Sequence, residues 1–536
     1  MPRAAHRVVV VGAGVGGLVS ALLLACRGLD VTLVEAAATP GGKMRQQQVD
    51  GAAIDGGPTV FTMRWVFEQI LAEAGADLSA LPPLQPLQVL ARHAWRGHGP
   101  TLDLHADAAA SAAAIGEFSG AAEARRFTAF CAEARKVYDE LEGPYIRSSR
   151  PSLLSMATDL GPSGLGALAG LGPFASLWGL LSRRFTDPRL QQLFGRYATY
   201  CGGSPWLAPA TLMLVAQVEM DGVWAVEGGM HAVARSLAAL ASARGVKLRY
   251  GTRVQRIAIA GGRTSGVVLE GGETLPADSV VFNGDPSALA HGLLGDAVQG
   301  AVRGTAHKDR SLSALTWAMH VRTEGFALVR HNVFFDDDYA AEFDDIFRAR
   351  RLPRRGTVYV CAQDRFDDGS LPGAVTSPAT GAARGDGRER LLCLVNAPAD
   401  GDRRPFDTIE TDPCETQLLS LLRQCGLTLH TTPQQVQLTT PQGFEQLFPA
   451  SGGALYGPAT HGWLALFKRP GAATALPGLF LAGGGVHPGP GVPMAAMSGR
   501  LAAATLMAHL DSTSRSRRVH ISGGISTRSA MTAGTR

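Results

Sequence analysis

The sequence predicts an α/β fold that opens with a dinucleotide-binding unit, and three observations support this prediction. A run of four valines at residues 8–11 has the β-branched composition of a strand buried on both faces. It passes directly into the spacing Gly-x-Gly-x-x-Gly, formed by Gly12, Gly14 and Gly17. A Leu- and Ala-rich stretch with helical composition comes next, and a second strand-like run ends at Glu35. This order of strand, turn, helix, strand and carboxylate is typical of a Rossmann-like nucleotide-binding domain.

Each residue of this unit has a physical reason for its position. Gly12 allows a tight turn, Gly14 lets the backbone approach a pyrophosphate, and Gly17 lets the following helix pack closely on the strand. Gly16 belongs to the same turn, and we count it among the cofactor-binding residues. The helix expected at residues 18–27 directs its positive N-terminal end at the phosphates. Glu35 can accept hydrogen bonds from a ribose, and its charge would repel a 2′-phosphate, which argues against NADP.

Two further glycine-rich segments separate FAD from NAD as the predicted cofactor. The spacing Glu-x5-Gly-Gly after the second strand resembles FAD-binding proteins of the amine oxidase and carotenoid desaturase superfamily. That resemblance implies that the second glycine pair and a nearby basic residue line the diphosphate and the flavin. The alternative interpretation is an ordinary glycine-rich surface loop. The cofactor-binding residues expected in these segments are Gly41, Gly42, Lys43, Arg45, Gly57, Pro58 and Thr59.

Length and composition narrow the class of protein. A chain of 536 residues is long enough for two or three domains with a large core. The formal net charge of +4 is small for this length, and no basic stripe with interleaved aromatic residues appears in the sequence, so we expect no nucleic-acid partner. The seven cysteines are scattered without zinc-like spacing, so we expect reduced thiols in the cytoplasm and no metal site. We expect no secretory signal, because the first strand begins almost at once.

The predicted nucleotide-binding domain is discontinuous. Strand and glycine patterns assign residues 1–75, 222–310 and 440–510 to an FAD-binding domain. Residues 76–221 and 311–439 form the inserted substrate- and membrane-binding region, with a mixed sheet and a helical part. Residues 511–536 are rich in Ser, Thr and Arg, and we expect a disordered tail there.

An uncharged segment at residues 161–182, followed by Arg183 and Arg184, bears on membrane contact. A transmembrane helix needs about 20 apolar residues, which this segment nominally supplies. Its glycines and Pro173 weaken a single continuous helix, however. Three interpretations remain open: a membrane span, a monotopic surface that enters the bilayer, and a wall of the core or of a substrate tunnel. The monotopic interpretation predicts a cytoplasmic protein attached to the inner face of the cell membrane.

The C-terminal element at residues 483–494 carries the strongest family signal. It reads Gly-Gly-Gly-Val-His-Pro-Gly-Pro-Gly-Val-Pro-Met, and with the glycine-rich start it makes residues 8–508 resemble the bacterial carotenoid desaturases. Residues 55–64 and 194–200 look closest to one branch, the 1-hydroxycarotenoid 3,4-desaturases, also called methoxyneurosporene dehydrogenases. The longer segment at residues 193–205 is aromatic and glycine-rich, more like a cavity wall than a simple helix.

This resemblance implies several site residues. Gly484, Gly485, Pro493 and Met494 would lie near the isoalloxazine, where free N–H groups of a helix start stabilise negative charge on a reduced flavin. By its position in its strand, Val254 matches the residue of these enzymes whose backbone contacts the adenine of FAD. His487 has two interpretations, a proton carrier or a residue that stabilises the turn before Pro488.

The resemblance also implies the chemistry. The reacting bond joins two saturated carbons, one of them allylic to a polyene, so hydride transfer to flavin N5 is expected, with proton loss from the neighbouring carbon. The expected substrate is an acyclic C40 carotenoid, and oxygen and a quinone both remain possible electron acceptors. No Asp, Glu or His identifies itself as the base. The alternatives are a phytoene-type desaturase, a carotenoid isomerase, or an isoprenoid-binding escort protein of the same fold without flavin chemistry.

Overall fold

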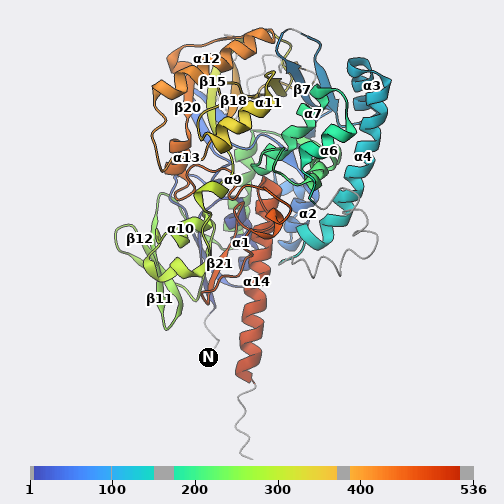
Figure 1. The fold of residues 1–536 in the computed structure, drawn as a ribbon. Coiled ribbons are helices and arrows are strands. Elements are labelled where there is room, and N and C mark those ends of the chain that lie inside the picture. The colour runs from blue at the N-terminus through green and yellow to red at the C-terminus, as the bar shows by residue number, and fades with distance from the viewer. Residues whose placement is uncertain (1–4, 98, 150–173, 368, 371–386, 519–536) are drawn as a thin grey trace, which may run out of the picture.

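The computed structural model describes residues 5–97, 99–149, 174–367, 369–370 and 387–518. Figure 1 shows a large mixed sheet at one end of the molecule, a parallel sheet below it, and helices alongside both. This mixed α/β architecture agrees with the predicted fold class.

A five-stranded parallel sheet holds the predicted nucleotide-binding unit. Its strand order is β10-β2-β1-β14-β21, and every neighbouring pair is parallel. The strands are β1 (Arg7–Val11), β2 (Asp30–Val34), β10 (Lys247–Arg249), β14 (Ser279–Phe282) and β21 (Leu479–Leu481). They come from all three chain segments that we assigned to the FAD-binding domain. Valine dominates β1, as expected for a central strand covered on both faces.

The two faces of this sheet are covered differently. Helix α1 (Val15–Cys26) packs with α9 (Met230–Ala243) and α14 (Val492–Arg518) on one face. Side chains of β11 and β12 share an apolar cluster with Val9 and Val34 of the parallel sheet. These strands belong to an antiparallel sheet formed by β11 (Val254–Ala260), β12 (Arg263–Leu269) and β13 (Thr274–Pro276).

The second large sheet has eight strands and is mostly antiparallel. Its strand order is β19-β15-β18-β17-β16-β7-β8, and β20 also pairs with β15. Among the described strand pairs of this sheet, β16–β7 is parallel and the others are antiparallel. Helix α12 (Thr408–Gln424) contributes buried leucines to the apolar cluster of this sheet. The strands are β7 (Val89–Trp95), β8 (Leu102–His105), β15 (Ser313–Gly325), β16 (His331–Phe335), β17 (Val358–Ala362), β18 (Glu389–Ala397), β19 (Leu427–His430) and β20 (Val436–Thr439).

Small strands connect the two large sheets. The hairpin of β3 and β4 lies against β15 and β18, and β9 pairs with both β5 and β6. Their bounds are β3 (Gln46–Val49), β4 (Ala52–Asp55), β5 (Phe61–Thr62), β6 (Leu84–Pro86) and β9 (Val223–Val226).

A helical layer flanks both sheets. Helices α3 and α4 form part of it, within the inserted region that we expected to be partly helical. The remaining helices with their bounds are α2 (Arg64–Glu73), α3 (Ala108–Ser119), α4 (Ala121–Leu141), α6 (Leu177–Arg184), α7 (Pro188–Gly195), α8 (Val215–Met220), α10 (Pro286–Ala290), α11 (Tyr339–Phe343) and α13 (Pro441–Leu447). A 3-10 helix, η3 (Arg196–Cys201), continues α7 through the aromatic segment that we expected to be irregular.

Only part of the uncharged segment at 161–182 can be compared with its three interpretations, because residues 161–173 lie outside the described residues. In the described part, Leu177, Leu180 and Leu181 are buried in α6. Trp178 stacks on Trp206 with ring centroids 4.4 Å apart. The core interpretation therefore holds for the α6 part. Among the helices that the structure describes, none combines the length and the hydropathy required to cross a bilayer.

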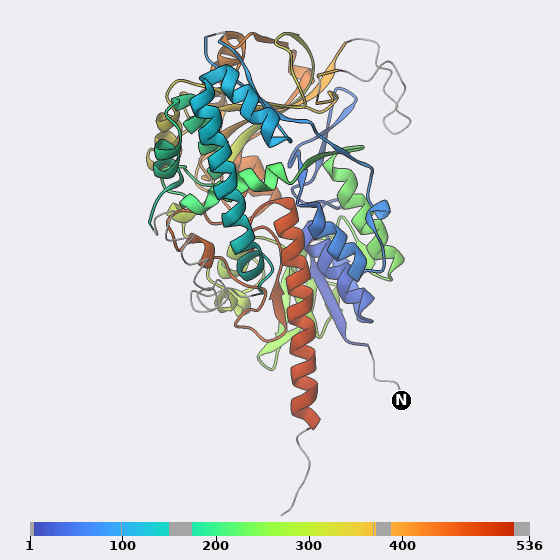
Figure 2. The same ribbon diagram turned by 90° about the vertical axis from the view of Figure 1, so that its right-hand side faces the viewer.

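Helix α14 reaches into the predicted tail. We predicted disorder over residues 511–536, but the helix continues to Arg518. Figures 1 and 2 show its last turns projecting beyond the body of the molecule. The prediction of disorder is therefore wrong for residues 511–518, and the rest of the tail lies outside the described residues.

Candidate active site

The glycine-rich turn packs around one side chain, that of Asn283 just after β14. Its amide nitrogen donates a hydrogen bond to the carbonyl oxygen of Gly12 at 3.3 Å. A Cβ on Gly14 would come within 2.7 Å of the same nitrogen, and a Cβ on Gly17 would overlap the Gly12 carbonyl oxygen. Gly12 has a φ of 101°, which side chains strongly disfavour. The turn therefore requires glycine at all three motif positions.

Helix α1 presents its N-terminus at this turn. Its N-cap residue is Gly14, and no side chain caps the helix. The first N–H groups of α1 therefore remain available to an anion, and the helix dipole favours negative charge there. Gly16 has a different reason to be glycine: its Cβ would come within 2.9 Å of the backbone nitrogen of Gly483. This turn offers the diphosphate a cradle with no side chain in the way.

Glu35 lies where a ribose carboxylate is expected. Its two oxygens accept hydrogen bonds from the backbone N–H groups of Ala13 at 2.6 Å and Ala37 at 2.8 Å. A carboxylate has about four lone-pair positions, so acceptor capacity remains for ribose hydroxyls. The bonds to Ala13 and Ala37 hold the carboxylate beside the glycine turn.

Val254 lies close to Glu35 in space although the two residues come from different segments of the FAD-binding domain. The backbone N–H of Thr252 donates to the Glu35 carbonyl oxygen at 2.9 Å, which places the start of β11 beside the ribose residue. Val254 is buried and shares an apolar cluster with Val34. This position is compatible with the adenine contact that we predicted.

The second glycine pair joins the first glycine turn directly. Gly41 forms an isolated parallel bridge with Gly14, and its N–H donates to the Ala13 carbonyl oxygen at 2.9 Å. A Cβ on Gly42 would come within 3.2 Å of the Gly14 Cα. The ordinary surface-loop interpretation is therefore wrong for this pair. The two glycine motifs form one backbone surface.

Lys43 is the enclosed cation of this surface. Its Nζ donates to the Leu455 carbonyl oxygen at 2.5 Å and lies 5.5 Å from the centre of the Phe448 ring. Burial lowers the pKa of Lys43 to about 8, with Asp285 raising it and Arg469 lowering it further. A buried ammonium with one carbonyl partner suits an anionic ligand.

Arg45 lies differently from the other predicted cofactor residues. Its guanidinium donates to the Thr439 Oγ1 at 3.1 Å and lies 5.7 Å from the Phe444 ring centre. None of its side-chain hydrogen bonds within the described ranges reaches a predicted cofactor residue. Its observed contacts tie the β3–β4 hairpin to β20 and α13.

The third glycine segment, Gly57-Pro58-Thr59, is held close to Lys43 because a Cβ on Gly57 would overlap the Lys43 carbonyl oxygen. Just before it, the Asp55 carboxylate accepts a hydrogen bond from the Met230 N–H at 2.5 Å. The hydroxyl of Thr59 lies 2.6 Å from the phenol oxygen of Tyr359, on β17 of the large sheet. Thr59 therefore joins the predicted cofactor residues to the eight-stranded sheet.

The C-terminal glycine segment closes the site on its other side. The Arg469 side chain is 8% exposed and donates to three backbone carbonyl oxygens, those of Tyr456 at 2.9 Å, Pro458 at 2.9 Å and Gly484 at 3.1 Å. A Cβ on Gly485 would come within 3.0 Å of the Pro286 ring. Pro493 is buried in the first turn of α14, and Met494 follows it half-buried. The start of α14 lies beside the first glycine turn, because a Cβ on Gly16 would come within 3.0 Å of the Ala495 carbonyl oxygen; the placement of these residues at the flavin stays a prediction.

His487 is held by structural contacts. Its Nε2 donates to the Ser148 carbonyl oxygen at 2.9 Å, and its ring meets Tyr145 edge-on at 4.9 Å. Burial lowers the pKa of His487. These contacts support the turn-stabilising interpretation over the proton-carrier interpretation.

A polar cluster that the sequence did not reveal adjoins Thr59. Tyr359 also hydrogen bonds to His331 Nδ1 at 2.8 Å, and the Arg196 guanidinium lies 5.2 Å from the Tyr359 ring centre. Arg196 and Tyr200 stand in η3, whose aromatic composition was the only signal of a cavity wall. Asn283 was equally missed, although a polar residue at the carboxyl end of a parallel strand is a known sign of a binding edge.

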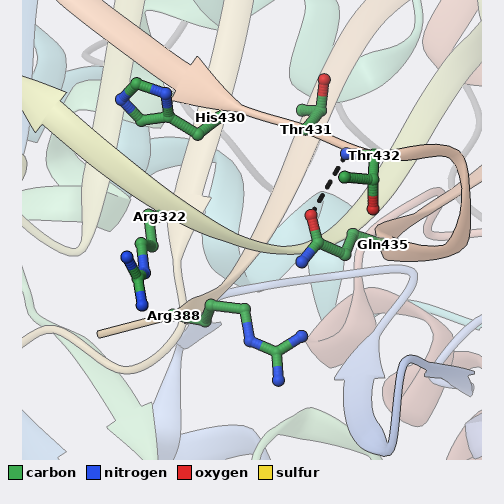
Figure 3. A pocket seen from close by; sticks show the side chains of 6 residues that line it. All are labelled: Arg322, Arg388, His430, Thr431, Thr432 and Gln435. Carbon is green, nitrogen blue, oxygen red and sulfur yellow. Dashed lines mark hydrogen bonds between the residues drawn. The ribbon is translucent and has the colours of Figure 1, made fainter. Parts of the chain in front are cut away.

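A surface cavity of about 420 Å³ lies elsewhere, on the eight-stranded sheet (Figure 3). It is lined by Arg322, Arg388, His430, Thr431, Thr432 and Gln435. None of these is a predicted cofactor residue, and the cavity is too polar for a hydrocarbon chain. Within the described residues, no group of three or more metal-ligating side chains was found there or elsewhere.

A family model described as flavin containing amine oxidoreductase matches residues 15–507. The chain belongs to this family. Hydroxyneurosporene desaturase of Rubrivivax gelatinosus is 69% identical over 533 residues, covering 99% of both chains. A 1-hydroxycarotenoid 3,4-desaturase of Flavobacterium sp. is 27% identical over 506 residues, covering 93% of this chain and 98% of the relative. The predicted membership of the carotenoid desaturases is confirmed.

The fold is also shared with solved structures. A single mutant of putrescine oxidase superimposes with a TM-score of 0.57 at 14% identity, covering 94% of this chain and 99% of the oxidase. At this identity the likeness concerns the fold alone. Family and fold together make the protein an FAD-dependent oxidoreductase, and the cradle of glycines, Glu35 and Lys43 described above fits that cofactor.

Proposed function

We propose that this protein introduces the C-3,4 double bond into acyclic 1-hydroxy or 1-methoxy carotenoids. The observation that carries the proposal is the identity of 69% to a hydroxyneurosporene desaturase across 99% of both chains. The motifs at residues 55–64 and 194–200, which resemble the 1-hydroxycarotenoid 3,4-desaturase branch, support the position of the new bond.

The reaction removes two electrons and two hydrogens from the substrate. FAD, which the glycine turns, Glu35 and Lys43 would hold, would supply the hydride acceptor for this reaction. One carbon of the reacting bond gives up a hydride, its neighbour gives up a proton, and the remaining electron pair becomes the new double bond. The polyene delocalises the positive charge that develops at the allylic carbon, so the demand on a protein base is low. Oxygen or a quinone would serve as the final acceptor of the two electrons.

The chain contributes position and the exclusion of water. The carbonyl contacts of Arg469 join Gly484 of the C-terminal glycine segment to the loop that contains Tyr456 and Pro458. The Thr59–Tyr359 bond joins that region to the large sheet at 2.6 Å. Rigid placement of the reacting carbons is worth several orders of magnitude in rate, which suits a reaction without an identified base.

We further propose that the protein works from the inner face of the cell membrane as a peripheral protein in the cytoplasm. Three exposed apolar side chains support this proposal: Phe174 (76% exposed), Leu207 (50%) and Trp463 (46%). The rings of Phe174 and Trp463 lie 5.7 Å apart, and the Gly462 N–H donates to the Leu207 carbonyl oxygen at 2.8 Å. The three therefore form one patch, and Phe174 belongs to the uncharged segment that Arg183 and Arg184 follow.

The activity test uses FAD-reconstituted protein in liposomes, with a 1-hydroxylated acyclic carotenoid and phytoene offered separately. A red-shifted product from the hydroxylated carotenoid alone supports the proposal. Conversion of phytoene would assign the protein to the early desaturases. Absence of any conversion with FAD bound would overturn the substrate assignment.

The membrane test is flotation with vesicles of anionic phospholipid. The triple variant Phe174→Ser, Leu207→Ser and Trp463→Ser should reduce the floated fraction several-fold, because each substitution removes apolar surface that enters the bilayer. Ile409→Ser is the matched control, since Ile409 is 81% exposed but lies on α12. Equal losses from both proteins would contradict the patch.

A further inference from the structure

We infer that Arg196 is the residue that recognises the oxygen at the end of the carotenoid substrate. This inference rests on the proposed function and names the group that reads the substrate's terminal oxygen. It starts from a charged side chain that is enclosed in the substrate region without a matching set of partners.

Arg196 is a cation with unused hydrogen-bond donors. A guanidinium has about five N–H donors and no acceptor. Among the described residues, the guanidinium makes one hydrogen bond, from Nη1 to the phenol oxygen of Tyr200 at 3.0 Å. The Arg196 side chain is partly buried, between the aromatic rings of Tyr200 and Tyr359. An enclosed cation with spare donors is costly unless a ligand supplies acceptors.

The surrounding residues fix the direction of this guanidinium. Its central carbon lies 5.2 Å from the ring centres of both Tyr200 and Tyr359. Tyr200 donates its hydroxyl to Glu219 Oε1 at 2.9 Å, and Tyr197 donates to Glu219 Oε2 at 2.8 Å. Glu219 therefore balances the charge through Tyr200 without occupying the remaining N–H groups of Arg196. Tyr200 and Glu219 are positioning residues in this arrangement.

The cluster stands beside the predicted flavin. Tyr359, one wall of the Arg196 site, shares a hydrogen bond of 2.6 Å with Thr59 of the third glycine segment. Tyr456 also interacts electrostatically with Arg196. Its neighbour Leu455 accepts the hydrogen bond from Lys43 at 2.5 Å. Two independent connections thus link the Arg196 site to the cofactor residues.

This location matches the shape of the substrate. Only C2 separates the oxygen-bearing C1 from C3 of the reacting bond, so the oxygen must lie near the flavin when that bond is placed for hydride transfer. The rest of the substrate is hydrocarbon and has no hydrogen-bond acceptor for Arg196. Because a guanidinium only donates, it can bind an alcohol oxygen or an ether oxygen, and it rejects an end group without oxygen.

The experiment compares three substrates with the FAD-loaded enzyme in liposomes: a 1-hydroxy carotenoid, its 1-methoxy counterpart and an analogue without the oxygen. The analogue is also measured as a competitive inhibitor, so its affinity is obtained whether or not it is converted. We expect Arg196→Met to lower kcat/KM for both oxygenated substrates by about 10- to 100-fold, the range for one hydrogen bond to a charged group. The affinity for the analogue should stay the same or increase. Arg303→Met, an exposed arginine, is the control.

Two further variants distinguish a loss of oxygen recognition from a general disruption of the site's structure. Arg196→Lys keeps the charge with fewer donors and should fall between wild type and Arg196→Met. Tyr200→Phe removes the anchor and should reduce the preference for oxygenated substrates without changing the affinity for FAD.

Other results would overturn the inference. If Arg196→Met weakened the binding of all three compounds equally, Arg196 would have a structural role only. If the variant changed the reduction potential of the flavin but not the substrate preference, Arg196 would act on the cofactor. If the wild-type enzyme converts no hydroxylated carotenoid, the proposed function fails. Dissociation constants of the three compounds, from their absorbance shifts, still decide whether Arg196 reads the oxygen.

Discussion

Asn283 and Gly12 meet at the centre of the candidate FAD site, where the side-chain amide nitrogen of Asn283 lies 3.3 Å from the Gly12 carbonyl oxygen. The same side chain lies under the positions where Gly14 and Gly17 would carry a Cβ. A neutral amide therefore supports the turn from the end of β14.

We predict that Asn283→Asp weakens FAD binding by about 10-fold or more, because an isosteric negative charge would stand next to the diphosphate and the turn carbonyl. The measurement is the dissociation constant of FAD from flavin fluorescence. Gln435→Glu on the surface cavity adds the same charge away from the cofactor residues and should leave that constant unchanged. Unaltered affinity in Asn283→Asp would contradict the placement of the diphosphate.

Helices α1 and α14 touch at two glycines. A Cβ on Gly499 would overlap the carbonyl oxygen of Gly16, and the Ser20 hydroxyl lies 3.1 Å from the Gly499 carbonyl oxygen. We expect Gly499→Ala to destabilise the protein by about 1–3 kcal/mol, because backbone faces backbone and neither helix can yield. The loss outweighs the gain in helix propensity.

Thermal unfolding of the FAD-loaded protein measures this effect as a lower Tm. Ala504→Ser on the exposed face of α14 is the control and should change the Tm little. A Gly499→Ala variant as stable as wild type would show that the two helices are not in close contact.

Lys43 should make the stability of the FAD-free protein depend on pH. Burial lowers the pKa of Lys43 in the folded state to about 8, from the ordinary value of 10.5. Below pH 8 the ammonium is charged in both states, so the cost of burying it is fully present. Between pH 8 and 10.5 the folded protein has released the proton while the unfolded chain still holds it, so the free energy of unfolding rises with pH.

We therefore expect Lys43→Met to be more stable than wild type at pH 7 without FAD, and this advantage to shrink as the pH rises through that window. Chemical unfolding of both FAD-free proteins at pH 7 and at higher pH tests the prediction. The same variant should bind FAD more weakly, since the stability cost of Lys43 serves an anionic ligand. An advantage that does not vary with pH would contradict the lowered pKa.

Local sequence patterns brought together glycine motifs that do lie side by side in the structure. The glycine motifs and Glu35 stand within one strand–turn–helix–strand unit, so their spacing already contains the geometry. The bridge between Gly41 and Gly14 agrees with the spacing Glu-x5-Gly-Gly that the family resemblance rests on. Arg45 differs, because its direction depends on Thr439 and Phe444, which lie far along the chain and in another sheet.

The substrate side could not be predicted in the same way. Arg196, Tyr359 and Thr59 come from a 3-10 helix, a strand and a loop, and only the packing of the two sheets brings them together. Helix α12 was missed because it contains Pro413 and begins with polar residues. Strand β16 starts with His331 and Asn332, which have low β-propensity but are buried by their neighbours.

The contacts of His487 lead to a prediction about the missing base. Its Nε2 is occupied by the Ser148 carbonyl oxygen, and burial lowers its pKa, so the ring is neutral near pH 7. We expect His487→Gln, whose amide nitrogen can replace the Nε2 donor, to keep kcat within about 10-fold of wild type and to leave the pH profile unchanged. His487→Ala should instead lower the Tm, because the Ser148 carbonyl oxygen would lose its donor. Steady-state rates across a pH series decide the matter: a loss of about 100-fold or more in His487→Gln, at unchanged FAD content, would restore His487 as the proton carrier.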